Sequence, residues 1–352
     1  MRVLVTGGSG FVGRSLLRKL AADGHAVRAL VRSEAAQRTV EACGAQAVFG
    51  EITEQGALWA ACEGVDQVVH LAAHVRDAGP RRVFYEVNVE GTRSMLSAAR
   101  RAGARRFVHV STEAVLLDGS PLIDVDETRP IPASPVGPYA WSKALAEKLV
   151  RAAHGPDFTS VVLRPRLIWG KGDTTLVPRL LDLVRRGRFA WIDGGTALTS
   201  TCHVRNVCAG IGCALREDAP GGVYFLSDGE PISFRSFLES VMRAHGTEPP
   251  LRSVPHWLAL ALARASEFAY ARLAPSAAPP LSRTAVLLMG QQMTVNDQLA
   301  RRVLKYRPVV SREDGLSELR GEVSLSVPPP PRGPRGPGSR EGGKRQGRSV
   351  SA

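Results

Sequence analysis

The side chains best placed for chemistry in this chain are a tyrosine and a lysine four residues apart, Tyr139 and Lys143. They follow Gly137-Pro138, where a helix is expected to begin, and this spacing puts both side chains on one face of the helix. A phenol with a pKa of about 10 is a poor base at neutral pH, and a neighbouring ammonium lowers that pKa by stabilising the phenolate. The pair therefore indicates acid–base chemistry by a tyrosine.

Two hydroxyl side chains, Ser111 and Thr112, follow an apolar run that ends at Val110. If this run is a strand of a parallel sheet, the hydroxyls lie at the carboxyl edge of the sheet, where ligands bind in such folds. Tyr-x-x-x-Lys alone is common in helices. Its combination with hydroxyls at a strand end favours a catalytic site over a chance pattern.

A glycine-rich segment directly follows the first apolar run of the chain and includes Gly7, Gly10 and Gly13. Gly7 permits a tight turn, Gly10 lets backbone N–H groups approach a pyrophosphate, and Gly13 lets the following helix pack closely on the strand. This context, between a strand and a helix, predicts a dinucleotide-binding loop rather than a plain turn.

The end of the second expected strand reads Leu30-Val31-Arg32-Ser33. An acidic residue here would bind the ribose 2′-hydroxyl of NAD, whereas the Arg32 guanidinium suits a 2′-phosphate and Ser33 adds a hydroxyl donor. We therefore expect NADP(H) to be favoured, with NAD(H) as the alternative cofactor. The competing interpretation of Arg32 is a solvated arginine at a strand end.

Over residues 1 to 320 the sequence resembles the extended short-chain dehydrogenase/reductase superfamily. Within it, the sequence is most similar to the 3β-hydroxysteroid dehydrogenase-like branch, of the NAD-dependent epimerase/dehydratase type, which includes reductases of long-chain 2-alkyl-3-ketoacids. The narrower match rests on 111–115 and 164–170. The broader match rests on Thr6 to Gly13, His70 to Ala73, Asn88 to Thr92, Tyr139 to Lys143, Leu163 to Pro165 and His203 to Val207.

The resemblance implies an NAD(P)-dependent oxidoreductase that interconverts a secondary alcohol and a ketone on a hydrophobic substrate, either sterol-like or a long-chain 3-keto acid. It implies that Tyr139 is the general acid/base, that Lys143 orients the nicotinamide ribose and lowers the tyrosine pKa, and that Thr112 hydrogen-bonds the substrate oxygen. The expected cofactor-binding residues are Gly7, Gly8, Ser9, Gly10, Phe11, Val12, Gly13, Arg32, Ser33, Glu51, Ile52, Leu71, Ala72, Ala73, Asn88, Tyr139, Lys143 and Pro165.

Two residues depart from the family pattern, and a third has two interpretations. Glu51 stands where the family usually has an aspartate beside the adenine, and Arg205 stands where an aspartate commonly precedes Asn206. Asn88 either holds a catalytic water or caps backbone near the site. His109, inside an apolar strand, is interpreted as a packed core histidine.

These residues require an α/β fold that brings strand ends together. Apolar runs near 2–6, 26–31, 45–49, 67–71, 106–110 and 159–164 alternate with helical patterns near 11–22, 34–43, 55–63, 82–102 and 139–153, which predicts a doubly wound parallel Rossmann sheet over 1–165. A strand at 223–227 is expected to return to this sheet, within a returning segment near 201–228. A smaller, mostly helical substrate lobe is expected over 166–320, interleaved with the sheet domain.

The amino-acid composition limits the class of protein and the kinds of partner that it can bind. The net charge is +13, but the last 28 residues carry +5 of it, and no basic module with aromatic residues suggests nucleic acid. Twelve of those 28 residues are Pro or Gly, so a disordered tail is expected over 326–352. Five cysteines without a Cys-x-x-Cys pair predict no metal site and a reducing compartment. Because the chain opens on a strand, we expect no signal peptide and a cytoplasmic location.

Three alternatives stay open at this stage. The apolar segment 255–273 either lines a substrate pocket or lies on a membrane surface. A nucleotide-sugar epimerase on the same scaffold is the rival enzyme, although Ala114 replaces an acid that sugar dehydratases need. A non-catalytic dinucleotide-binding scaffold is the third, and the Tyr139, Lys143 and Thr112 set argues against it. The sequence is also compatible with a homodimer.

Overall fold

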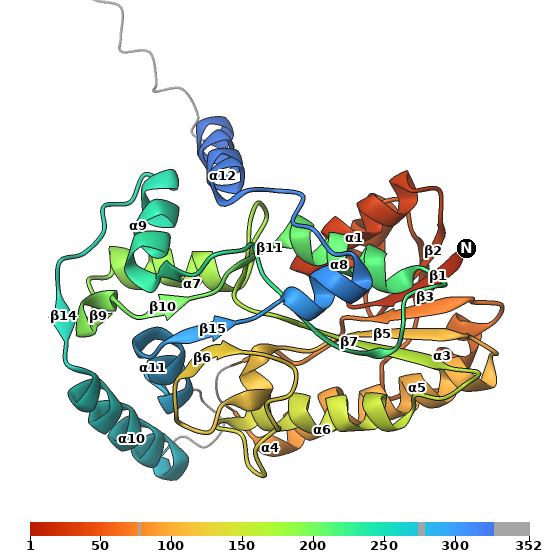
Figure 1. Ribbon diagram of the computed structural model, residues 1–352, viewed down its shortest axis with the longest axis horizontal. Helices are drawn as coiled ribbons and strands as arrows, with labels where there is room; N and C mark the ends of the chain where they lie inside the picture. Colours follow the sequence, from red (N-terminus) through yellow and green to blue (C-terminus); the bar gives the residue numbers. More distant parts are fainter. Residues whose placement is uncertain (77–78, 274–278, 327–352) are drawn as a thin grey trace, which may run out of the picture.

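The centre of the molecule is a seven-stranded parallel sheet (Figure 1). The structure, a computed structural model, describes residues 1–76, 79–273 and 279–326, and the side chains of 321–326 are outside that description. Six strands agree with the predicted ones to within one residue, and β12, expected at 223–227, pairs with β7 at the edge. In order the strands are β12 (Gly222–Leu226), β7 (Thr159–Pro165), β5 (Arg106–Val110), β4 (Gln67–His70), β1 (Arg2–Thr6), β2 (Ala26–Val31) and β3 (Gln46–Phe49).

Helices cover both faces of this sheet, and each face has its own apolar core. The inner strands β1 and β4 are buried on both sides, which explains the apolar residues at their centres. One face packs against α1 (Phe11–Ala22), α2 (Glu34–Glu41) and α8 (Val204–Leu215). The other face packs against α3 (Gln55–Cys62), α5 (Gly91–Arg101) and α6 (Pro138–Ala152). The predicted doubly wound fold is confirmed.

The helix expected at 82–102 is continuous but changes its winding. It consists of α4 (Arg81–Phe84), a π-helical segment η1 (Tyr85–Glu90) and α5. Single π-helical turns are rare and often occur at functional sites. Here the irregular turn carries Asn88, which is buried.

A smaller lobe lies beside the carboxyl ends of the central strands and is mostly helical, as predicted (Figure 1). It also contains strands that are too short for the sequence period to reveal. A four-stranded sheet has the order β13 (Ile232–Ser233), β10 (Leu198–Thr199), β15 (Met293–Val295) and β6 (Leu122–Val125), and two pairs join β11 (Cys202–His203) to β8 (Ile168–Trp169) and β14 (Ser253–Val254) to β9 (Trp191–Ile192). The helical segments of the lobe are α7 (Leu176–Arg185), α9 (Phe234–Ala244), α10 (His256–Leu273), α11 (Arg283–Gly290) and α12 (Arg312–Ser326), with the 3₁₀ turn η3 (Asp193–Gly195). The short segment η4 (Ala300–Leu304) packs instead on the central-sheet core beside α8, and the 3₁₀ turn η2 (Glu113–Leu116) follows β5.

Two sequence expectations concern the far end of the chain and the membrane. The expected disordered tail lies outside the described residues, apart from Ser326 at the end of α12. Within the described ranges, no helix is both long enough and apolar enough to cross a bilayer.

Candidate active site

The catalytic pair predicted from sequence lies at the start of α6, against the end of β5. Gly137 precedes this helix with φ of +89°, a conformation that suits glycine. Lys143 is buried, and its Nζ donates to the carbonyl oxygen of Val110 at 2.7 Å and lies 3.0 Å from Nε2 of His109. The side chain is therefore fixed at the carboxyl end of a central strand, one turn beyond Tyr139.

The electrostatics of the pair differ from the expectation that Lys143 lowers the phenol pKa. Burial lowers the pKa of Lys143 to about 7. Burial, together with the negative charge of Glu113, raises the pKa of Tyr139 above its ordinary value. The Lys143 ammonium donates to the carbonyl oxygen of Val110 and lies beside His109 Nε2. Tyr139 is accordingly a neutral phenol that can donate a proton.

Thr112 lies directly after β5, where the sequence placed it, and it caps the short 3₁₀ turn η2. Its oxygen accepts from the backbone N–H of Ala114 at 3.2 Å, and its hydroxyl donates to the Glu113 carboxylate at 2.8 Å. Glu113 is buried and forms a 2.7 Å ion pair with Arg166, which is buried as well. A buried ion pair thus stands immediately beside the candidate oxygen-binding hydroxyl.

A second buried ion pair lies one helical turn beyond Lys143 and was missed by the sequence reasoning. Glu147 accepts from Arg164 through both carboxylate oxygens, at 2.5 and 3.1 Å, and from Ser111 at 2.8 Å. It joins α6 to β7 and to the segment after β5. The available signal was the spacing, since Tyr139, Lys143 and Glu147 recur every four residues along one face.

The glycine loop has the close contacts that its sequence predicts. Gly7 has φ of +72°, and a Cβ there would lie 2.8 Å from the backbone nitrogen of Ala72. A Cβ on Gly13 would lie 2.2 Å from the Gly7 carbonyl oxygen, so only glycine fits. Gly10 is the N-cap of α1 and carries no capping side chain, which leaves this helix start for an anionic group. Ser9, Phe11 and Val12 complete the loop, and Gly8 packs on Leu17 and Ala29.

The segment after β4 approaches this loop. The backbone N–H of Ala72 donates to the Thr6 hydroxyl at 3.2 Å, and Leu71 and Ala73 flank it, partly buried. The Asn88 side chain accepts from the His74 backbone N–H at 2.6 Å and donates to the Ser142 hydroxyl at 2.9 Å. The contact with the His74 N–H is the one expected if Asn88 caps backbone near the site.

The residues expected around the adenine end of the cofactor differ in their exposure to solvent. Arg32 is exposed directly after β2, and Ser33 caps α2 by accepting from the Ala36 N–H at 3.3 Å. Burial lowers the pKa of His74, and the charges of Arg76 and Arg32 lower it further. Arg76 was not singled out from sequence. Of the remaining predicted contacts, Glu51 is exposed, Ile52 packs on Gly91 and Pro165 is buried in β7.

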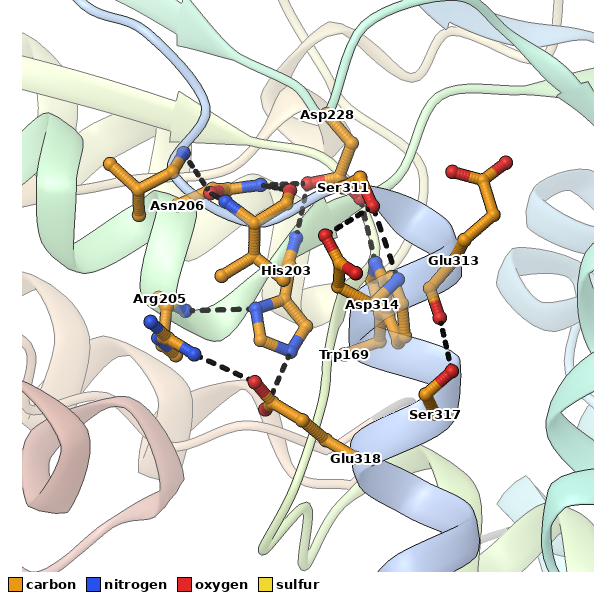
Figure 2. A network of polar contacts seen from close by, with 12 residues as sticks. Trp169, His203, Arg205, Asn206, Asp228, Ser311, Glu313, Asp314, Ser317 and Glu318 are labelled. Atoms are coloured by element: carbon orange, nitrogen blue, oxygen red, sulfur yellow. Dashed lines mark hydrogen bonds and ion pairs between the residues drawn. The ribbon is translucent and has the colours of Figure 1, made fainter.

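Arg205 stands where the family pattern has an aspartate, but a polar network still forms around Asn206. Asp228 lies at the centre of this network (Figure 2). Asp228 accepts from the Asn206 amide at 2.7 Å, from the His203 backbone N–H at 2.6 Å and from the Trp169 indole at 2.7 Å. Arg205 instead pairs with Glu318 of α12 at 2.6 Å. The network therefore fastens α12 and the β8–β11 pair to the sheet, and the aspartate comes from the end of β12.

These residues fit a dinucleotide with its reactive end at α6. The glycine loop has close backbone approaches that a Cβ would fill, Lys143 is buried against the end of β5, Thr112 follows that strand, and Tyr139 precedes Lys143 by one helical turn. Among the described residues, no group of three or more His, Cys, Asp or Glu side chains is placed to hold a metal ion.

Comparison with known proteins places the chain in a family. The sequence profile of the 3-beta hydroxysteroid dehydrogenase/isomerase family matches residues 4–256. A 4-hydroxy-2-methyl-3-oxo-4-farnesyl-3,4-dihydroquinoline-1-oxide ketoreductase of Stigmatella aurantiaca is 47% identical over 91% of this chain and 96% of its own. A 2-alkyl-3-oxoalkanoate reductase of Stenotrophomonas maltophilia is 33% identical, over 91% and 98% of the two chains.

A solved structure of a similar protein holds NAD. A dTDP-glucose 4,6-dehydratase of Streptomyces venezuelae, crystallised with NAD, superposes with a TM-score of 0.71 at 26% identity, covering 93% of this chain and 98% of that one. The sheet order, the glycine loop and the Tyr139 and Lys143 pair all suit a nicotinamide dinucleotide as the cofactor. As its motifs predicted, the chain belongs to the 3-beta hydroxysteroid dehydrogenase/isomerase family and is an oxidoreductase of that class.

Proposed function

We propose that this protein is an NADP(H)-dependent oxidoreductase that interconverts a ketone and a secondary alcohol on a largely apolar substrate. The observation that carries the proposal is the arrangement of Thr112, Tyr139 and Lys143 at the ends of β5 and α6, beside the glycine loop. The relatives are named for a farnesylated dihydroquinoline oxide, for 2-alkyl-3-oxoalkanoates and for 3 beta-hydroxysteroids, all of which join an oxo or hydroxyl group to an apolar skeleton.

The contacts of these residues support the following roles. A nicotinamide held at this site would supply hydride chemistry at the carbon that bears the substrate oxygen. Tyr139, kept neutral by burial, donates its proton to the substrate oxygen in the reductive direction. Thr112 polarises the same oxygen through its hydroxyl. The Lys143 ammonium has three N–H donors. We assign two of them to His109 and Val110, which leaves the third for the cofactor ribose.

The preference for NADP(H) is proposed from the cations at the adenine end. Arg32 is exposed directly after β2, and its charge and that of Arg76 both lower the pKa of His74. A 2′-phosphate suits two such guanidinium groups, whereas no acidic residue directly follows β2 to bind a ribose 2′-hydroxyl. The Ser33 hydroxyl accepts one hydrogen bond as a helix cap and keeps its own hydrogen to donate.

The test of the function is cofactor oxidation with a panel of substrates. The panel contains a 3-ketosteroid, a long-chain 2-alkyl-3-ketoacid, a prenylated quinolone ketone and a UDP-sugar, each with NADPH and with NADH. Turnover of at least one apolar ketone, faster with NADPH, supports the proposal. Interconversion of UDP-sugars without net cofactor consumption, and no turnover of any apolar ketone, would favour the epimerase instead.

The surface of α10 suggests a peripheral contact with an anionic membrane. Trp257 and Phe268 are 70% and 61% exposed, and Arg272 lies 4.4 Å from the centre of the Phe268 ring. Arg264 is exposed on the same helix, which therefore combines aromatic side chains with positive charge. Such helices bind at the boundary between headgroups and acyl chains. The buried side of α10 packs on α11.

Sedimentation with vesicles tests this contact. We expect the protein to pellet with vesicles that contain phosphatidylserine and less with pure phosphatidylcholine, and we expect a Trp257→Ser/Phe268→Ser variant to stay in the supernatant. A matched control is Trp59→Ser, which removes a partly exposed aromatic residue on α3. Equal pelleting of all variants, or concentration-dependent self-association that the double variant abolishes, would contradict the membrane assignment.

A further inference from the structure

His109 contacts the candidate catalytic lysine directly, although it lies inside the sheet. It is the fourth residue of β5 and is 1% exposed. Its Nε2 lies 3.0 Å from Lys143 Nζ, and its pKa is lowered well below the ordinary value by burial and by the lysine charge. Its Nδ1 is buried and has no hydrogen-bond partner among the described residues, and a neutral ring with its hydrogen on Nδ1 presents the Nε2 lone pair to the ammonium.

A second buried histidine holds the ring of His109 in place. His70 is opposite His109 in the β4–β5 pairing, and the two rings stack with centroids 5.4 Å apart. His70 is hydrogen-bonded on both nitrogens, to Thr6 at 2.8 Å and to Thr92 at 3.0 Å. Because Thr6 precedes the glycine loop, this chain of contacts runs from that loop to the candidate catalytic helix.

We propose that His109 is a positioning residue that orients the Lys143 ammonium by accepting one of its hydrogens. The Val110 carbonyl oxygen takes a second hydrogen, so the two β5 acceptors together leave a single N–H directed away from the strand. That N–H is the one assigned to the cofactor ribose, so the inference rests on the proposed function. His109 itself touches neither substrate nor cofactor in this account.

The charge of Lys143 depends on this contact and on few other groups. The described titratable groups that bear on it are His109, His70 and Glu147, and Glu147 is already bound to Arg164 and Ser111. A hydrogen bond to the charged form raises the pKa of a lysine. Removing the His109 acceptor should therefore move the Lys143 pKa further below about 7.

Variants that keep or remove the acceptor test the proposal. Glutamine places an amide oxygen near the position of the histidine Nε2, whereas leucine fills similar space without an acceptor. We expect His109→Leu to weaken NADPH binding at pH 6.5 by about tenfold or more, the scale of one hydrogen bond to a charged group. His109→Gln should stay within about threefold of the wild type, because it restores the acceptor. The pH above which affinity declines should be lower in the leucine variant.

Val162→Ala is the matched control for a disturbed core. Val162 is the β7 partner of His109 in the sheet and is 1% exposed, but its side chain has no polar atom. Losses in Val162→Ala equal to those in His109→Leu, or failure of His109→Gln to restore binding, would overturn the proposal. Binding is measured by fluorescence without substrate, so a wrong substrate assignment leaves the result readable.

A measurement on the unmodified protein covers the case in which the leucine variant does not fold. Nitrogen-15 NMR of histidine-labelled wild-type protein below pH 7 distinguishes a protonated ring nitrogen from an unprotonated one. The proposal requires an unprotonated Nε2 and a protonated Nδ1 on His109. A ring protonated on Nε2 under these conditions could not accept from the ammonium, and that result would overturn the assignment.

Discussion

The hydroxyl of Thr112 donates its hydrogen to the carboxylate of Glu113, with 2.8 Å between the two oxygens. To polarise a ketone, Thr112 must turn this hydrogen toward the substrate, whereas it can accept a hydrogen bond from an alcohol without changing its contact with Glu113. The same carboxylate pairs with Arg166 at 2.7 Å, and both side chains are buried. A substrate ketone therefore competes with the buried Glu113 carboxylate for the hydrogen of the Thr112 hydroxyl.

Removal of the Thr112 hydroxyl should slow the reaction more than it weakens binding of the cofactor. For Thr112→Val we expect turnover to fall by about a hundredfold or more, as for loss of one donor to a developing oxyanion. Thr112→Ser keeps a hydroxyl and should retain most of the rate. Steady-state kinetics, with cofactor affinity measured separately, give both values. A valine variant as fast as the serine variant would exclude this role.

The Glu113–Arg166 pair should show the energetics of a buried ion pair. Glu113→Met leaves the buried Arg166 guanidinium without its partner, and we expect a loss of about 3 to 5 kcal/mol in the free energy of unfolding. Adding Arg166→Met removes the unpaired charge and should restore most of that stability. Urea denaturation of the three proteins provides the comparison. No recovery in the double variant would show that packing, not charge, explains the loss.

Cofactor affinity should decline as the pH rises through neutrality. Burial lowers the pKa of Lys143 to about 7, and the proposed ribose contact requires the charged form. Bound cofactor therefore raises this pKa, so affinity is greatest below pH 7 and falls by up to about tenfold per pH unit above it. Calorimetry in two buffers of different ionisation enthalpy should detect proton uptake on binding near pH 7.5. A Lys143→Met variant should bind weakly and without this proton uptake, and a pH-independent wild type would contradict the assignment.

Arg32 decides the preference between the two nicotinamide cofactors in this account. Arg32→Ala should weaken NADPH binding by about 1.5 to 3 kcal/mol and leave NADH binding nearly unchanged, because only NADPH carries the 2′-phosphate. Arg38→Ala on α2, which removes an exposed arginine paired with Glu34, is the control for general charge. If the wild type already prefers NADH at equal concentrations, Arg32 is only a solvated side chain.

Much of the fold and the core of the site could be predicted because their signals are local. The apolar runs around Val5, Val69 and Val108 mark buried parallel strands, and Gly7 and Gly13 are positions where any Cβ would collide with backbone. Tyr139 and Lys143 share a helix face by spacing alone.

The missed features depend on contacts between distant segments. Glu113 and Arg166 are 53 residues apart, and Asp228 and Asn206 are 22 apart, so no periodic pattern pairs them. His109 was interpreted correctly as a buried core residue, but its contact with Lys143 depends on how α6 crosses the end of β5. The π-helical turn that carries Asn88 has no sequence period of its own.

The most direct test of the central claim compares wild-type protein with Tyr139→Phe on an apolar ketone, such as a long-chain 2-alkyl-3-ketoacid, with NADPH. The phenylalanine keeps the ring and loses only the proton that Tyr139 is assigned to donate. We expect the wild type to oxidise NADPH in step with formation of the alcohol. We expect the variant to be slower by about two to four orders of magnitude, with nearly unchanged cofactor affinity. A variant within a few-fold of the wild-type rate would contradict the assignment of Tyr139 and the mechanism built on it.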